Sequence, residues 1–422
     1  MARVHVEVYG CSANQADAEI ASGLLLEAGH SLAETAEAAD VSVILTCIVK
    51  TPTETKIVRR LGELAGRHVV VAGCMPKALR SLVEETHPGA SLVGPDDVAR
   101  IPEAVEKAAT GGRAVYLEGS SPNRTCFPRE RRSGLIHIAP IAAGCLGNCS
   151  YCIVKVARGR LYSFPPEGIV ADAEAAVASG CKEIWVTAED TAAYNFEGVR
   201  LPELIDRLCA IDGKFMVRIG MTTPNSVLPI FDDITETFQG EKVYKFLHVP
   251  VQSGSDVVLA RMRRKYTVTE FKELITRFRE AIPGIGIATD IICGFPGETE
   301  GQFGESLSLV EWLRPDMLNR SRFWPRPGTE ATGMKDQFPS RITKDRSRVL
   351  DELWWRVNAD LNQAWVGWEG DVLLDKLGHS SFKEGRTNSY KAVVLKTRKR
   401  LGDCVRVRVT EAAKGYLIGE EA

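Results

Sequence analysis

Six of the eleven cysteines in the 422-residue chain occur in patterns that suit a metal centre. Three of them, Cys145, Cys149 and Cys152, lie within eight residues, so one short loop can direct three thiolates at a single centre. Three ligands leave one iron of a four-iron cluster open to a small molecule, whereas a site with four cysteines is closed. The spacing also fits a zinc site with a fourth ligand such as Cys126, or buried cysteines without a metal. The position after a strand that opens a series of βα units favours the cluster.

Three more cysteines, Cys11, Cys47 and Cys74, each follow an apolar run typical of a buried parallel strand. The carboxyl ends of parallel strands meet at one edge of a sheet, so we expect these thiolates to converge although they are far apart in sequence. A single cysteine after a strand is usually a small buried hydrophobic residue. Three in equivalent positions indicate a second metal site. The other cysteines share no spacing and are predicted to be non-ligands, mostly buried: Cys126, Cys181, Cys209, Cys293 and Cys404.

The elements that must position these cysteines alternate between strand and helix over residues 1–117, which indicates a small doubly wound α/β domain. The expected strands are Val4–Tyr9, Val41–Thr46 and Val69–Ala72, and the expected helices are Asn14–Ala28, Thr53–Ala65, Lys77–Glu85 and Asp96–Ala109. Residues 118–133 are polar and basic without periodicity, and we expect a linker there.

Residues 134–366 repeat the alternation on a longer scale and predict an open or closed parallel barrel, with reactive loops at the carboxyl ends of its strands. The expected strands are Ile136–Ile141, Glu183–Thr187, Phe215–Ile219, Lys245–Val249, Gly286–Ile292 and Met317–Phe323. The expected helices are Pro166–Ser179, Leu201–Ile211, Asn225–Phe238, Val268–Ala281 and Glu300–Leu313, with a closing helix near Ser340–Trp365.

Residues 367–422 alternate apolar and polar side chains between glycine-rich turns, which predicts a small antiparallel β-barrel. The segment from Lys376 to Lys414 has eleven Lys and Arg against three acidic residues, a local charge of +8 in a chain whose net charge is −2. Together with Tyr390 and Phe382, these charges suit an RNA backbone with some base stacking. The expected RNA contacts are Lys396, Arg398, Lys399, Arg400, Arg406 and Arg408.

The overall composition, 44% hydrophobic and 26% charged, excludes a disordered chain or a small disulfide-stapled one. No apolar run approaches the roughly 18 residues that indicate a membrane helix, and the first residues lack the pattern of a signal peptide. Cysteine in a large chain of this kind indicates metal binding or catalysis in a reducing cytoplasm rather than disulfides.

The whole chain resembles the radical S-adenosylmethionine methylthiotransferases, most of all the archaeal and eukaryotic branch that modifies tRNA. The last domain resembles the TRAM module, a small RNA-binding β-barrel. The motifs are specific in combination: Tyr9–Asn14, Thr46–Lys50, Ala72–Pro76, Cys145–Cys152, Ala157–Arg160, Val186–Tyr194, Arg218–Met221, His248–Ser255, Thr289–Thr299, Arg326–Thr329 and, in the last domain, Gly385–Tyr390. Two positions depart from the family pattern, because Leu45 stands where Asn is usual and Asn195 where Gly is usual.

The resemblance implies two [4Fe–4S] clusters. Cys145, Cys149 and Cys152 would hold the cluster that binds S-adenosylmethionine, and Cys11, Cys47 and Cys74 an auxiliary cluster that carries the sulfur to be transferred. One S-adenosylmethionine would donate a methyl group to sulfur and a second would be cleaved to a 5′-deoxyadenosyl radical, chemistry that a cofactor rather than a side chain supplies. The implied target is C2 of N6-threonylcarbamoyladenosine at position 37 of tRNA.

Several polar residues near the expected rim are candidates for cofactor binding. Arg218 is equally consistent with a structural ion pair, and Asp290, inside an apolar strand, needs a polar partner. Tyr151 is placed beside the adenine by the resemblance. His248 is more simply a hydrogen-bonded core histidine, and Asn14 and Asp17 a helix cap and dipole partner. The complete set of cofactor-binding candidates is Tyr151, Glu189, Asp190, Arg218, Gln252, Ser253 and Asp290.

The sequence is also compatible with other functions. The same chemistry can act on N6-isopentenyladenosine in tRNA or on a ribosomal protein side chain, and a non-catalytic RNA-binding protein with one structural metal is a third reading. The basic last domain favours RNA, and an anticodon-loop base splayed from its stack can enter a cavity. The expected partners are a tRNA anticodon stem-loop, a low-potential electron donor and a sulfur source, and we expect a monomer with no membrane contact.

Overall fold

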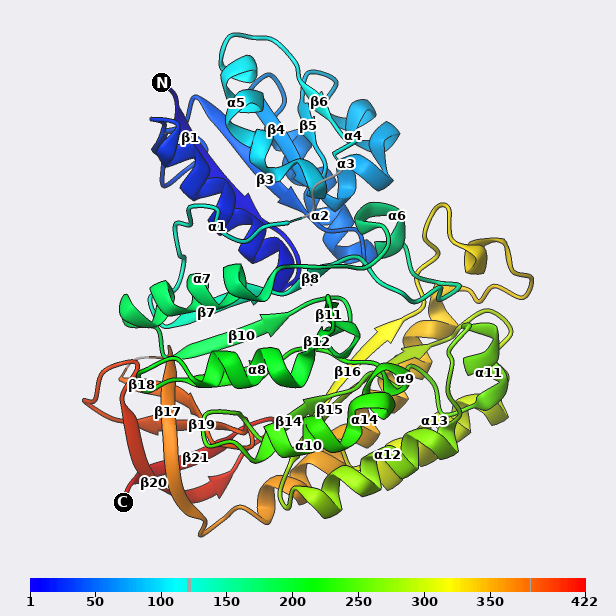
Figure 1. Cartoon of the computed structure of the whole chain (residues 1–422). Coiled ribbons are helices and arrows are strands. Elements are labelled where there is room, and N and C mark those ends of the chain that lie inside the picture. Colours follow the sequence, from blue (N-terminus) through cyan, green and yellow to red (C-terminus); the bar gives the residue numbers. More distant parts are fainter. Residues whose placement is uncertain (120–122, 380) are drawn as a thin grey trace.

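The computed structural model describes residues 1–119, 123–379 and 381–422, which form three consecutive domains (Figure 1). The first is a six-stranded parallel sheet in the order β2-β1-β3-β4-β5-β6. Its strands are β1 (Arg3–Val8), β2 (Ser31–Leu32), β3 (Val41–Thr46), β4 (His68–Gly73), β5 (Ser91–Val93) and β6 (Val115–Tyr116). The direction of winding reverses between β1 and β3, which confirms a doubly wound domain and places its switch point beside Cys11 and Cys47.

Helices cover both faces of this sheet because β3 and β4 are apolar on both sides. One face packs on α1 (Ser12–Glu27) and α5 (Ile101–Ala109), and the other on α2 (Thr51–Glu63), α3 (Cys74–Ala78) and α4 (Arg80–Thr86). The helix predicted at Lys77–Glu85 is thus two helices that meet at Leu79, and the start of the one predicted at Asp96 is a 3-10 turn, η1 (Pro95–Arg100).

The second domain is an open parallel barrel of six strands in two hydrogen-bonded sheets, β7-β10-β13 and β14-β15-β16. The strands are β7 (Ile136–Pro140), β10 (Glu183–Thr187), β13 (Met216–Ile219), β14 (Phe246–His248), β15 (Gly286–Cys293) and β16 (Met317–Arg322). A single parallel bridge between Val217 and Val243 joins the two sheets.

Helices follow the strands and pack on the outer face of this barrel, where the main hydrophobic core lies between helices and strands (Figure 1). They are α7 (Pro166–Ala178), α8 (Leu201–Cys209), α9 (Pro224–Val227), α10 (Phe231–Gln239), α11 (Asp256–Arg261), α12 (Val268–Ala281), α13 (Glu300–Leu313) and α14 (Ser340–Gln363). Both α12 and α13 have the predicted bounds, because capping boxes at Thr267 and Thr299 fix where they begin. The helix predicted at Asn225–Phe238 is broken into α9, a 3-10 turn η3 (Leu228–Ile230) and α10.

Short elements complete the second domain near the cysteine loop and the rim. They are β8 (Ala142–Ala143), α6 (Val154–Arg158), β9 (Tyr162–Ser163), η2 (Thr191–Ala193), β11 (Asn195–Phe196), β12 (Val199–Arg200) and η4 (Glu330–Gly333). Among the described residues, no helix is long and apolar enough to cross a membrane.

The third domain is a closed barrel in the order β17-β18-β19-β21-β20. Its strands are β17 (Glu369–Leu377), β18 (Phe382–Arg386), β19 (Ala392–Lys396), β20 (Cys404–Ala412) and β21 (Leu417–Glu421). Alternate side chains of these strands fill its interior, as predicted. The barrel is not wholly antiparallel, because β19 and β21 pair in parallel.

Residues 120–122 of the segment predicted as a linker lie outside the described residues, and the part from 123 to 133 has no regular secondary structure but is packed against α1. A Cβ on Gly23 would lie 2.3 Å from the carbonyl oxygen of Pro128, so the two backbones are in direct contact. The Glu130 amide donates to the Glu19 carbonyl, and Arg132 donates to the Val6 carbonyl. Residues 123–133 therefore fasten the first domain to the second rather than separate them.

The third domain closes the barrel of the second at the amino ends of its strands. The Lys245 amide donates to the Asn388 carbonyl at 2.8 Å, and Lys391 Nζ forms an ion pair with Asp316 at 2.8 Å. Tyr390, 7% exposed, packs its ring 4.9 Å from the rings of both Tyr244 and Phe246. The prediction that Tyr390 stacks on RNA is therefore wrong, since its ring is buried between two domains.

Candidate metal centres

Cys11, Cys47 and Cys74 meet at the carboxyl edge of the first sheet. Cys11 precedes α1, Cys47 follows β3 and Cys74 begins α3. Gly10 permits the close approach, because its φ is 137° and a Cβ there would lie 2.7 Å from the Cβ of Cys47. The three thiols are thus held within electrostatic reach of one another, as the sequence predicted.

Two buried polar side chains join the strand ends that carry these cysteines. Asn14 Nδ2 donates to the carbonyls of Tyr9 and Thr46, which connects the ends of β1 and β3. Thr46 Oγ1 donates to the Ala72 carbonyl and accepts from the Met75 amide, which connects β3 with β4 and α3. The interpretation of Asn14 as a helix cap is wrong, since its side-chain amide donates hydrogen bonds to the strand ends instead.

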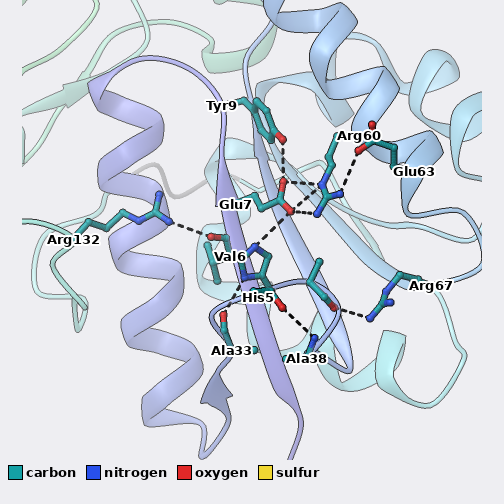
Figure 2. A network of polar contacts seen from close by, with 12 residues as sticks. His5, Val6, Glu7, Tyr9, Ala33, Ala38, Arg60, Glu63, Arg67 and Arg132 are labelled. Carbon is teal, nitrogen blue, oxygen red and sulfur yellow. Dashed lines mark hydrogen bonds and ion pairs between the residues drawn. The ribbon is translucent and has the colours of Figure 1, made fainter.

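A polar network behind this edge anchors the residue before Gly10 (Figure 2). Tyr9 donates its hydroxyl to Glu7 Oε2 at 2.9 Å, and Arg60 of α2 donates to both oxygens of Glu7. Burial raises the pKa of Glu7, but the bond and charge of Arg60 prevail and hold it below its ordinary value. Glu7 is therefore an ionised anchor that fixes Tyr9, and with it the start of the Cys11 loop, against α2.

The thiols of this edge have the chemistry of metal ligands. Burial raises the pKa of Cys74 to about 12, Arg158 opposes the rise, and the thiolates of Cys11 and Cys47 add to it. Burial likewise raises the pKa of Cys47. Buried thiols of this kind lose their protons when a metal centre compensates the thiolate charge, so the donor set fits an iron–sulfur cluster.

Cys145, Cys149 and Cys152 line one tight loop between β8 and α6. The Gly147 amide donates to Cys145 Sγ at 3.2 Å, and a Cβ on Gly147 would lie within 4 Å of both Cys145 Sγ and Cys149 Sγ. Burial raises the pKa of Cys152 to about 11, and the charge of Cys149 adds to the rise. Arg264 Nη1 lies 3.4 Å from Cys149 Sγ and supplies a half-buried positive charge beside the loop. Three thiols around one loop fit a cluster with an open position.

No group of three or more His, Cys, Asp or Glu within the described ranges is arranged to hold one metal ion. Zinc ligands lie about 2.3 Å from the ion when they are thiolates, which requires tight grouping. Neither three-cysteine set is grouped tightly enough for a single ion in this way, and the zinc alternative with Cys126 as a fourth ligand stays a prediction. Of the five cysteines predicted to be mostly buried, Cys126 and Cys404 are exposed, Cys209 is half-buried, and only Cys181 and Cys293 are buried.

Arg158 connects the two cysteine sets, and the sequence drew attention to it only as part of the run Ala157–Arg160. From the end of α6 it donates to Asn14 Oδ1 at 3.0 Å and to Asp17 Oδ2 at 2.8 Å, and its Nε lies 3.4 Å from Glu189 Oε1. Asp17 also accepts from Arg124, so it is a buried ion-pair partner and not the predicted helix-dipole residue. The sequence contains both residues, an Asp one turn into α1 and an Arg after the cysteine loop. That they form an ion pair can be seen only in the folded structure.

The predicted cofactor residues of the rim have distinct surroundings. Burial raises the pKa of Asp190, while hydrogen bonds from Thr223 and Ser226 oppose the rise. Burial also raises the pKa of Glu189, and Arg158 opposes it. Tyr151 packs edge-on against Phe295, with ring centroids 6.5 Å apart. These three side chains lie around the cysteine loop, where a cofactor bound to an open iron would be.

Two further candidates serve the structure of the barrel. The buried Ser253 lies 3.5 Å from Ser306 and accepts from the Ser255 amide. Gln252 has a φ of 73° and its amide donates to the Asp290 carbonyl, so its backbone extends the sheet beside β15. The contacts of Ser253 account for its hydroxyl, whereas those of Gln252 are made by its backbone and leave its side chain as a cofactor-binding prediction.

Asp290 and Arg218 line the inside of the barrel. Asp290 Oδ1 lies 2.8 Å from His248 Nε2 and accepts from Asn319 at 2.8 Å, so the predicted polar partner of Asp290 and hydrogen bond of His248 are confirmed. The Arg218 guanidinium lies 5.0 to 5.4 Å from the ring centroids of Trp185, Phe246 and Tyr390. Arg218 is therefore part of the junction with the third domain, at the end of the barrel opposite to the rim.

The six predicted RNA-binding residues are all exposed on the third domain. Arg408 forms an ion pair with Glu369 at 2.6 Å, and Arg406 a longer one with Asp371 at 3.9 Å, so part of their charge is locally balanced. The remaining four form the end of β19 and the turn that follows it: Lys396, Arg398, Lys399 and Arg400.

Family models match each of the three domains. The Radical SAM superfamily matches residues 140–310, the Uncharacterized protein family UPF0004 matches 3–94, and the TRAM domain matches 363–421. The fold is similar to that of a radical S-adenosylmethionine methyltransferase from Kitasatospora setae, with a TM-score of 0.56 and 13% identity over 91% of this chain and 81% of that one. Fold and cysteine loop together define a radical S-adenosylmethionine enzyme, which uses that cofactor and a [4Fe–4S] cluster.

Full-length relatives define the family more narrowly. A probable threonylcarbamoyladenosine tRNA methylthiotransferase of Pyrococcus horikoshii is 40% identical over 100% of this chain and 99% of its own length. The threonylcarbamoyladenosine tRNA methylthiotransferase of Drosophila melanogaster is 38% identical over 99% of this chain and 77% of its own length. The chain belongs to the threonylcarbamoyladenosine tRNA methylthiotransferase family.

Proposed function

We propose that the chain adds a methylthio group to C2 of N6-threonylcarbamoyladenosine at position 37 of tRNA. The proposal rests on one observation: a buried polar network connects two sets of three cysteines. Each set can hold a metal cluster and leave one of its metal positions open. Such pairing suits a reaction that needs both a radical and a sulfur donor, and the names of the full-length relatives indicate the substrate.

The two sets would have different roles. Cys145, Cys149 and Cys152 would hold the cluster that binds S-adenosylmethionine, and the other three would hold a second [4Fe–4S] cluster: Cys11, Cys47 and Cys74. When bound, these groups supply the electron, the radical chemistry and the sulfur that no side chain can provide. The protein supplies position: Cys47 and Cys74 are buried, Cys145, Cys149 and Cys152 are half-buried, and Cys11 is exposed at the same edge.

The residues around the cysteine loop would orient the cofactor. Asp190, held by Thr223 and Ser226, offers carboxylate oxygens to an ammonium or ribose hydroxyl, and the ring of Tyr151 offers an apolar surface to the adenine. The exposed basic turn of the third domain would contact tRNA phosphates, which position the substrate without selecting the base. An electron donor and a sulfur source are the further partners, and a monomeric state in the cytoplasm stays a prediction.

Two measurements test this proposal. After anaerobic reconstitution, iron and sulfide should be present in the amounts that two four-iron clusters require, and one tightly held metal without sulfide would support a non-catalytic RNA-binding protein instead. Deleting the gene in its host should remove 2-methylthio-N6-threonylcarbamoyladenosine from tRNA nucleosides analysed by mass spectrometry. Loss of the methylthio derivative of N6-isopentenyladenosine, or of a modified ribosomal protein, would give the reaction a different substrate.

A further inference from the structure

We propose that Arg158 is a positioning residue for the second cluster, which it holds at a fixed place beside the radical-forming site and stabilises in its reduced state. This inference rests on the proposed function, because it requires a cluster on Cys11, Cys47 and Cys74. Arg158 is buried with 6% of its surface exposed, and it lies at the end of the helix that follows the other cysteine loop.

The contacts of Arg158 reach three parts of the molecule at once. Its Nη2 serves Asn14 and Asp17 of α1, and its Nε faces Glu189 on the rim of the second domain. The positive charge of the same guanidinium opposes the rise in the pKa of the buried Cys74 thiol, which places it close to that cysteine. A planar fork with five N–H donors can satisfy these directions together, whereas the single ammonium of a lysine cannot.

The Asn14 contact also ties Arg158 to the geometry of the cysteines. Asn14 joins the strand ends that precede Cys11 and Cys47, and its free oxygen is the one that accepts from Arg158. Displacing the guanidinium therefore removes one of the three hydrogen bonds that hold the Asn14 side chain between these two loops. Because α6 continues from the Cys145–Cys152 loop, the same contact fixes one cysteine set relative to the other.

The charge of Arg158 is expected to act on the reduction potential. A cluster becomes more negative when it accepts an electron, and a buried positive charge or a hydrogen bond to its sulfur ligands favours that state. Asp17 and Glu189 offset part of this charge, and Arg124 in turn offsets Asp17. Removing the guanidinium should therefore lower the potential of the second cluster.

The test uses the full chain with Cys145, Cys149 and Cys152 changed to Ala, so that only the second set can bind a cluster. After anaerobic loading with iron and sulfide, the reduced fraction is measured by electron paramagnetic resonance during titration with dithionite. In this background R158M should lower the ratio of reduced to oxidised cluster at a fixed potential about tenfold, which corresponds to about 59 mV for one electron. R158K, which keeps the charge, should recover at least half of that shift.

Two arginines serve as matched controls in the same background. R124M removes the other ion-pair partner of Asp17, and R264M removes the half-buried cation beside the Cys145–Cys152 loop. Each should change the ratio by less than about threefold. An R158M ratio within threefold of the parent would overturn the inference while leaving the second cluster intact.

Iron content separates the remaining outcomes. No iron on the background variant would refute the second cluster, and this inference with it. Failure of R158M alone to take up iron, with R124M and R264M loaded, would support Arg158 as the residue that organises the set. Failure of R158M and R124M alike would indicate a general structural role of the buried ion pairs and would overturn the inference.

Discussion

The sharpest stability prediction concerns Tyr390→Ala at the junction between the last two domains. Truncating a buried aromatic ring to Ala costs about 3–5 kcal/mol, and Tyr390 is 7% exposed. The contact with Arg218 adds about 1 kcal/mol. Because Tyr390 has a φ of 63°, a strained region for any side chain, Ala keeps the strain and loses the ring. Together these give about 4–6 kcal/mol, and the lower value already corresponds to roughly a thousandfold increase in the separated form.

Native-state hydrogen exchange of the full chain measures this change. Amides in residues 244–248 and 286–290, which lie against the loop of Tyr390, should lose about three orders of magnitude in protection. Tyr390→Phe keeps the ring and should change protection by less than tenfold. Tyr416→Ala, at a ring 39% exposed on the same domain, is the matched control. Unchanged protection in Tyr390→Ala would show that the ring does not hold the domains together.

Three further predictions concern the cysteines, an anchor and the basic turn. Cys47→Ala should abolish methylthiolation but leave some reductive cleavage of S-adenosylmethionine, with iron content reduced by about one four-iron cluster in elemental analysis; full methylthiolation would contradict the auxiliary role. The pKa of Glu7 is held below its ordinary value of 4.5, so its stabilisation is complete above that pH and is lost as the pH falls through the lowered pKa. Glu7→Gln should therefore lower the melting temperature at pH 7 and reduce the acid sensitivity of the first domain, and an unchanged acid transition would argue against the anchor. The last variant replaces the four residues of the basic turn by Gln: Lys396, Arg398, Lys399 and Arg400. It should reduce the slope of log affinity for tRNA against log salt by about 0.7–0.9 for each phosphate that the protein no longer neutralises. Arg408→Gln, at a residue paired with Glu369, should change this slope less.

Elements with strong local signals could be predicted from the sequence. The apolar β3 and β4, and the capped helices α12 and α13, occur where the pattern places them. The convergence of Cys11 and Cys47 followed from a general property of parallel sheets and needed no knowledge of the folded chain. The short strands β5, which lies inside the sheet, and β6, at its edge, have too few residues to produce a periodic signal and were missed.

The packing of one domain on another could not be predicted in the same way. Arg158, Asp17 and Arg124 are ordinary polar residues in the sequence, and their roles arise because segments more than 100 residues apart meet in one buried place. Tyr390 has the composition of an RNA-stacking residue, but burial against Phe246 depends on how two separately predicted domains pack. Long-range burial of polar and aromatic groups leaves no local pattern.

The position of the third domain sets a fixed distance between the basic turn and the cysteine loop of the second domain. Gly402, next to the basic turn, lies against Leu135 and Lys182 just before β7 and β10 begin, while Glu189 lies just beyond the other end of β10. Residues 183–188 separate these ends, a span of about 20 Å at roughly 3.3 Å per residue. If the basic turn binds RNA as proposed, that RNA must span at least this distance before a base can reach Glu189 and the cysteine loop at the other end of the barrel. A hairpin shorter than this span cannot occupy both places, so the enzyme would distinguish its substrate by reach as well as by the base itself.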